Sequence, residues 1–140
     1  MTHYRLQFLF LLLLMLQNIS VACAEDTAPL KVPGATTIGT AAAKMLHEKG
    51  YPFVDVRGMK HFRDGHIPGA KHLAIHGEDF TAENLHKIAK KNQLVVFYCN
   101  GITCMGSSIA SKKAVEWGWT QVAYYRAGIP QWKEQGFSVE

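Results

Sequence analysis

Two cysteines, Cys99 and Cys104, are the residues of this chain best suited to nucleophilic chemistry. Cys99 directly follows residues 94–98 (LVVFY), a continuous apolar run of the length expected for a strand buried on both faces of a parallel sheet. Ligands of open α/β sheets bind beyond the carboxyl ends of such strands, and a thiolate placed there is a nucleophile. The alternative is a buried structural cysteine, which is the commoner fate of a single cysteine.

The segment after Cys99 suits the binding of an anion. Its residues lead into a helix that we expect to be capped by Ser107 or Ser108. Backbone N–H groups and the positive end of the helix dipole would stabilise a thiolate and hold an oxyanion-bearing substrate. The predicted loop consists of Asn100, Gly101, Ile102, Thr103, Cys104, Met105, Gly106 and Ser107.

Cys104 adds a second thiol inside this loop. As a resolving thiol it could attack a persulfide or sulfenate on Cys99 and close a disulfide. Two alternatives stay open: Cys104 is a small packing residue, or it is itself the main nucleophile, since it lies nearer the start of the helix. The sequence has no Cys-x-x-Cys pair and no histidine cluster at ligand spacing. We therefore expect no metal site and no bound cofactor.

Predicted strands and helices alternate along the chain, which is typical of a parallel α/β sheet. Thr40 is expected to cap the first helix and Gly50 to end it. Glycine and proline between residues 65 and 70 predict a loop. The expected strands are 34–38, 53–56, 71–75, 94–98 and 121–125, and the expected helices are 41–49, 60–63, 81–91, 107–117 and 130–135.

Three short motifs resemble those of the single-domain rhodaneses, a family of sulfurtransferases. They are VDVR at residues 54–57 with GHIPGA at 65–70, VVFYCNG at 95–101, and YRAG at 125–128 followed by Trp132. The resemblance covers residues 37–140. It implies a three-layer α/β fold with a central, mainly parallel five-stranded sheet flanked by helices.

The resemblance also implies a reaction and the residues that perform it. In the family, the cysteine at the position of Cys99 attacks the outer sulfur of a donor such as thiosulfate and becomes a persulfide. It then passes that sulfur to a thiol or to cyanide. Backbone N–H groups from Asn100 to Ser107 would hold the persulfide. Asp55 and Arg57 would support the site, although a purely structural ion pair is the alternative, and His66 would fix its loop.

The chain departs from the family pattern in its loop. Ser107 comes two residues later than usual, and no arginine or lysine stands between Cys99 and Ser107. Phosphatases of this fold need an arginine six residues after the cysteine, where this chain has Met105. A phosphate monoester would therefore lack the arginine that binds its phosphate group. A second hypothesis is therefore a non-catalytic sulfur carrier or thiol-redox module that uses Cys99 and Cys104, with a redox protein as partner.

The first 24 residues have the pattern of a signal peptide. Arg5 precedes an apolar run over residues 6–16, and the small residues Ala22 and Ala24 flank Cys23. An apolar core of roughly eleven residues is shorter than the ~20 needed to span a bilayer, which disfavours a membrane anchor. Cleavage after Ala24 predicts an exported, periplasmic protein. Lipidation at Cys23 is an alternative, although Ser20 stands where leucine is usual.

Residues 25–36 are expected to be a flexible segment that precedes the domain at 37–140. The chain has 15 basic and 11 acidic residues, a formal net charge of +4. Its basic residues are spread along the chain, which is typical of a solvated surface and not of a nucleic-acid site. The expected partners are a small sulfur donor and a thiol or cyanide acceptor, with no nucleic acid and no membrane span after cleavage.

Overall fold

The computed structural model describes residues 27–140, and the predicted signal peptide, its cleavage site and Cys23 lie outside this range. Five strands form one sheet in the order β1-β5-β4-β2-β3. All its strand pairs are parallel, where the sequence predicted a mainly parallel sheet. The strands are β1 (Ala35–Thr37), β2 (Phe53–Asp55), β3 (Lys71–His72), β4 (Val95–Tyr98) and β5 (Val122–Tyr125).

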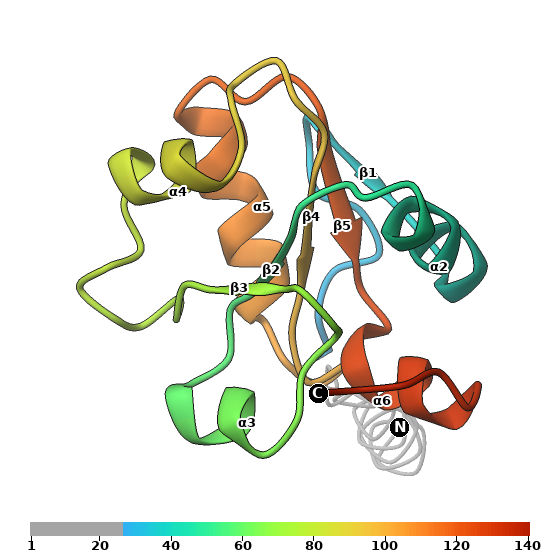
Figure 1. Ribbon diagram of the computed structural model, residues 1–140. Coiled ribbons are helices and arrows are strands. Elements are labelled where there is room, and N and C mark those ends of the chain that lie inside the picture. The colour runs from blue at the N-terminus through green and yellow to red at the C-terminus, as the bar shows by residue number, and fades with distance from the viewer. Residues whose placement is uncertain (1–26) are drawn as a thin grey trace, which may run out of the picture.

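Helices cover both faces of this sheet, so the predicted three-layer arrangement is confirmed (Figure 1). One face is covered by α4 (Ala82–Ile88) and α5 (Gly106–Glu116), and the other by α2 (Thr40–Glu48) and α6 (Gly128–Glu134). The short helix α3 (Met59–Arg63) lies near the carboxyl ends of the strands (Figure 1). Among residues 27–140, no helix is both long and apolar enough to cross a bilayer.

The alternation of side chains along β4 divides the core into two clusters, because successive strand residues point to opposite faces. Val95, Phe97 and Cys99 pack beneath α4 and α5. Val96 and Tyr98 pack against α2 and α6 on the other face. Cys99 therefore belongs to the α5 side of the sheet, one residue beyond the end of the strand.

Several predicted boundaries differ from the structure. Gly39 and not Thr40 precedes α2 as its N-cap, and the Thr40 hydroxyl oxygen instead accepts a hydrogen bond from Tyr125 at 3.0 Å. Met105 is the N-cap of α5, so neither Ser107 nor Ser108 caps that helix. The predicted helix over 81–91 ends early, since α4 closes at Ile88, and β3 is shorter than the predicted strand over 71–75. At Thr40, a tertiary hydrogen bond thus takes the place of the predicted cap.

The described part of the predicted flexible segment, from residue 27, is held against the domain. The Ala28 N–H donates to the Ile102 carbonyl at 2.7 Å, and Arg126 Nε donates to the Ala28 carbonyl at 2.9 Å. The Tyr124 hydroxyl donates to the Pro29 carbonyl at 3.1 Å. Ala28 is buried by these contacts. These contacts join residues 28 and 29 to parts of the domain that lie far away in the sequence.

Tyr98 ties β4 to the loop at 65–70. Its hydroxyl oxygen accepts a hydrogen bond from the Ile67 N–H at 3.1 Å. Burial, with a smaller effect of the Asp55 carboxylate, raises the pKa of the Tyr98 phenol well above its usual value, so the hydroxyl stays protonated.

Replacing Tyr98 with phenylalanine should lower the free energy of unfolding by about 1–3 kcal/mol, because it leaves a buried N–H without an acceptor. The urea midpoint measures this change. Tyr51→Phe, at an exposed tyrosine, is the matched control and should leave the midpoint almost unchanged. Equal midpoints for the two variants would show that the bond between Tyr98 and Ile67 contributes nothing.

Candidate active site

Cys99 lies at the point where the strand order of the sheet reverses. From β2 the chain continues outward to β3, whereas from β4 it continues to β5 on the other side. The carboxyl ends of β2 and β4 therefore border the crevice where ligands of open α/β sheets bind. Val56 follows β2 and donates its N–H to the Tyr98 carbonyl at 3.2 Å. This bond joins the two strand ends directly in front of Cys99.

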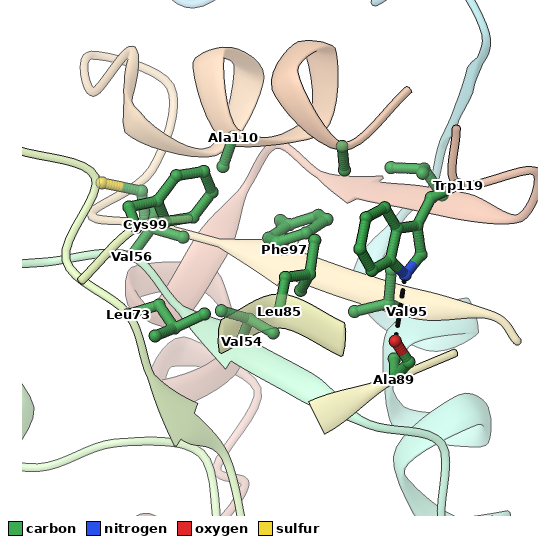
Figure 2. Packing of buried hydrophobic residues seen from close by; sticks show 13 residues of the cluster. Val54, Val56, Leu73, Leu85, Ala89, Val95, Phe97, Cys99, Ala110 and Trp119 are labelled. Atoms are coloured by element: carbon green, nitrogen blue, oxygen red, sulfur yellow. Dashed lines mark hydrogen bonds between the residues drawn. The ribbon is translucent and has the colours of Figure 1, made fainter. Parts of the chain in front are cut away.

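Cys99 and Cys104 form a disulfide in this structure, and their Cα atoms are 6.3 Å apart. Cys99 is only 3% exposed and belongs to the core cluster on the α5 side. Figure 2 shows Cys99 at one end of this cluster beside Val56, with its sulfur atom directed away from the other side chains. Cys104 is half-buried and packs against the same cluster. The structure thus brings together both sequence-predicted thiols.

The loop between the cysteines is folded back on itself. The Cys104 N–H donates to the Gly101 carbonyl at 3.0 Å, which closes a turn over residues 101–104. Gly101 has a φ of +96°, a conformation that favours glycine. The exposed side chains of Ile102 and Met105 border the turn. Anchored by the Ala28–Ile102 hydrogen bond, this turn carries Cys104 onto Cys99.

The amino end of α5 faces the two sulfurs. A methyl group added at Gly106 would lie 2.9 Å from Cys99 Sγ and 3.5 Å from Cys104 Sγ. The N–H groups of Gly106, Ser107 and Ser108 donate to no protein group within residues 27–140, as expected for the first turn of a helix. These amides and the helix dipole can stabilise a thiolate or persulfide anion.

Ser107 is fully buried, and its hydroxyl has no hydrogen-bond partner within residues 27–140. Ser108 instead donates from its hydroxyl to the Met105 carbonyl at 2.8 Å. The loop carries no basic side chain. Binding of an anion at this site therefore depends on backbone amides.

Gly128 supports the site from the segment that follows β5. The Ile129 N–H donates to the Cys99 carbonyl at 3.1 Å, which docks the start of α6 onto the residue that bears the nucleophile. Gly128 has a φ of +62°, and a side chain there would collide with the Cys99 carbonyl and the Gly101 nitrogen. The glycine of the YRAG motif is thus required by a close approach of two backbones.

Gly128→Ala should destabilise the protein through the left-handed backbone, at about 1–2 kcal/mol, and through the collision with Cys99. Gly136→Ala is a matched control, because Gly136 has a φ of +75° and open space around its Cα. We expect Gly128→Ala to cost at least about 1 kcal/mol more than the control in urea unfolding. Equal losses would mean that the contact with Cys99 is not tight.

Asp55 and Arg57 form a buried ion pair. Arg57 Nη2 lies 2.6 Å from Asp55 Oδ2, and Arg57 Nε donates to the same carboxylate. Nη2 also donates to the Gly65 carbonyl at 2.8 Å. Asp55 is in register with Tyr98, so its side chain points to the face opposite Cys99. The pair therefore ties the end of β2 to the loop at 65–70 and touches neither sulfur.

His66 and the tryptophans are engaged in packing. His66 stacks on Phe62 with ring centroids 3.7 Å apart, and its backbone pairs with Glu140. Trp119 donates its Nε1–H to the Ala89 carbonyl, and Trp132 donates to the Ser138 carbonyl. Within the described residues, no group of three or more His, Cys, Asp or Glu side chains is placed to hold a metal ion.

A parallel α/β sheet with a cysteine loop at its switch point is the arrangement expected of a rhodanese-type domain, and comparisons with known proteins agree. The family model of the rhodanese-like domain matches residues 39–135. The chain therefore belongs to the rhodanese-like domain family. A comparison with curated proteins found no match.

Solved structures place this chain among rhodanese folds. The BH2092 protein from Bacillus halodurans is 27% identical, with a TM-score of 0.66 over 75% of this chain and 76% of its own. The RPA3614 protein from Rhodopseudomonas palustris, described as of unknown function and a possible tyrosine phosphatase, is 30% identical with a TM-score of 0.64, over 76% of this chain and 85% of that chain. The human single-domain sulfurtransferase TSTD1, at 22% identity and a TM-score of 0.58, shares the fold over 71% of this chain and 96% of its own.

Sequence reasoning missed two supports of the site. Ala28 and Arg126 hold the loop through Ile102, and Ala28 lies outside the residues that match the family. Only Arg126 had a signal in the sequence, as part of the YRAG motif. The bond between Ala28 and Ile102 has none, because it joins residues that are distant along the chain.

Proposed function

We propose that this protein is a sulfurtransferase that carries sulfane sulfur as a persulfide on Cys99. The proposal rests on one observation: Cys99 directly follows the central strand β4, beside the first amides of α5, which have no partner within residues 27–140. Membership of the rhodanese-like family supports it. The loop that follows Cys99 would surround the persulfide with Asn100, Gly101, Ile102, Thr103, Met105, Gly106 and Ser107. Asp55 and Arg57 support the neighbouring loop at residues 65–70.

The reaction has two transfers. Once the disulfide is reduced, the Cys99 thiolate attacks the outer sulfur of thiosulfate; the sulfur–sulfur bond of the donor breaks and sulfite leaves. A small persulfide can serve as donor in the same way and leaves as a thiolate. A thiol or cyanide then attacks the outer sulfur of the Cys99 persulfide and restores the thiolate. The first-turn amides of α5 stabilise the anionic form at both stages.

Incubation of the reduced protein with thiosulfate and cyanide tests the proposal. We expect thiocyanate to form over many turnovers. Without cyanide, samples quenched early in the reaction should contain protein heavier by one sulfur atom, located on Cys99 by peptide mapping. An absence of both thiocyanate and the sulfur adduct, with thiosulfate and with glutathione persulfide as donors, would refute the function.

A thiol-redox module or non-catalytic sulfur carrier is the second candidate, because the two thiols are joined in the structure and the loop has no basic side chain. It predicts that the disulfide cycles with a redox partner while thiocyanate does not form. Phosphatase activity is not proposed, because Met105 occupies the position of the arginine clamp.

We also propose that the protein is exported after cleavage behind Ala24. The pattern of residues 1–24 supports this proposal, and export would place the thiols in an oxidising compartment. N-terminal sequencing and intact mass of the protein from a periplasmic extract should give Glu25 as the first residue. A lipid-modified Cys23 at the N-terminus would instead indicate a membrane-anchored lipoprotein.

A further inference from the structure

The two cysteines differ in their exposure to solvent. Cys99 is 3% exposed and lies within the core cluster, whereas Cys104 is half-buried at the surface of the loop. Ile102 and Met105, which border Cys104 in the loop, are 47% and 44% exposed. A reagent arriving from solvent therefore meets Cys104 first when the disulfide is closed.

The backbone of the loop is built so that Cys104 reaches the sulfur of Cys99. The turn closed by Cys104 and Gly101 directs the chain back toward the strand, and the anchor from Ala28 to Ile102 holds it there. Gly106 leaves the space that both sulfurs occupy. The separation of 6.3 Å between the Cα atoms lies in the usual range for a disulfide. Folding of the loop itself thus brings the second thiol to the first.

We propose that Cys104 is a resolving thiol that converts the Cys99 persulfide into hydrosulfide. This inference rests on the proposed function, which supplies the persulfide. The Cys104 thiolate attacks Sγ of Cys99, the bond between that Sγ and the outer sulfur breaks, and the outer sulfur leaves as HS⁻. Cys104 is oxidised to the disulfide level, and the sulfane sulfur is reduced to sulfide. The disulfide in the structure is the protein product of this step.

A dithiol reductant completes the cycle. Its first thiolate attacks the accessible Sγ of Cys104, so a mixed disulfide forms there and the Cys99 thiolate is released beside the amides of α5. The second thiol of the reductant then frees Cys104 and closes the disulfide of the reductant. Each cycle consumes one sulfane sulfur and one dithiol, and produces one hydrosulfide and one oxidised dithiol.

A single-turnover experiment separates the loading of sulfur onto Cys99 from the resolution of the persulfide by Cys104. Protein that has been reduced and freed of reductant is mixed with thiosulfate in the absence of cyanide, and sulfite and hydrosulfide are trapped and quantified. Sulfite reports the loading of Cys99, whereas hydrosulfide reports resolution by Cys104. Samples quenched during the reaction are measured by intact mass, and glutathione persulfide serves as a second donor.

The wild-type protein should release sulfite first and hydrosulfide second. Its intact mass should first rise by one sulfur atom and then fall to that of the disulfide form, two hydrogens lighter than the reduced protein. Cys104→Ser should release sulfite but keep the sulfur adduct on Cys99, with hydrosulfide release lower by at least about tenfold. It should still form thiocyanate when cyanide is added.

Two results would overturn the inference while the proposed function stands. One is a stable Cys99 persulfide in the wild-type protein with Cys104 still a free thiol, and the other is equal hydrosulfide release by Cys104→Ser. A Cys104→Ser protein that takes up no sulfur from either donor, while its circular dichroism matches the wild type, would refute both the proposed function and this inference.

Discussion

Replacing Cys99 with serine is expected to lower the rate of thiocyanate formation by about 10⁴-fold or more, to the rate without protein. A serine hydroxyl at neutral pH is a far weaker nucleophile than a thiolate, and it cannot form a persulfide. The variant should show no sulfur adduct after incubation with thiosulfate. Serine is close in size to cysteine, so the fold should be retained, with a loss of about 1–3 kcal/mol because a hydroxyl is buried at this position.

Cys104→Ser is the matched control for this variant, since it also removes the disulfide and leaves one cysteine in the loop. If Cys99 is the nucleophile, only the Cys104 variant retains thiocyanate formation. The opposite pattern, with activity retained in Cys99→Ser and lost in Cys104→Ser, would show that Cys104 is the main nucleophile. The sequence left that alternative open.

Replacing Asp55 with asparagine is expected to cost about 3–5 kcal/mol of the free energy of unfolding, because it leaves the buried charge of Arg57 without its partner. Asp55 is 0% exposed and Arg57 is 6% exposed, so water cannot replace the carboxylate. The urea midpoint should fall while the slope of the transition is unchanged. Since the pair faces away from Cys99, thiocyanate formation by the folded fraction should change much less than stability.

Asp64→Asn provides a control for removing an ion-paired aspartate. Asp64 pairs with Lys60 at 2.7 Å, as tightly as Asp55 pairs with Arg57, but both partners are exposed. Lys60 lowers the pKa of Asp64, yet solvent screens this pair. The control should therefore leave the midpoint nearly unchanged. Equal effects of the two substitutions would contradict a structural role for the Asp55–Arg57 pair.

Much of the fold could be predicted from the sequence, because its signals are local. The apolar run at 94–98 indicated a buried central strand, and the alternation of strand and helix patterns indicated a parallel sheet. The position of Cys99 at a strand end followed from the same run. Helix starts were less predictable. Thr40 and Ser107 are residue types that often cap helices, but Thr40 accepts a hydrogen bond from Tyr125 and Ser107 is buried within the first turn of α5.

The sequence by itself determined that a thiol stands at the end of the central strand and that a second thiol stands in the loop after it. Only the tertiary structure decided that the two are joined, that Cys99 is buried while Cys104 is accessible, and that Asp55 and Arg57 face the other side of the sheet. These facts depend on contacts between distant segments, such as Ala28 with Ile102 and Ile129 with Cys99. Hydrophobic periodicity and turn residues report only on near neighbours along the chain, so such contacts leave no local signal.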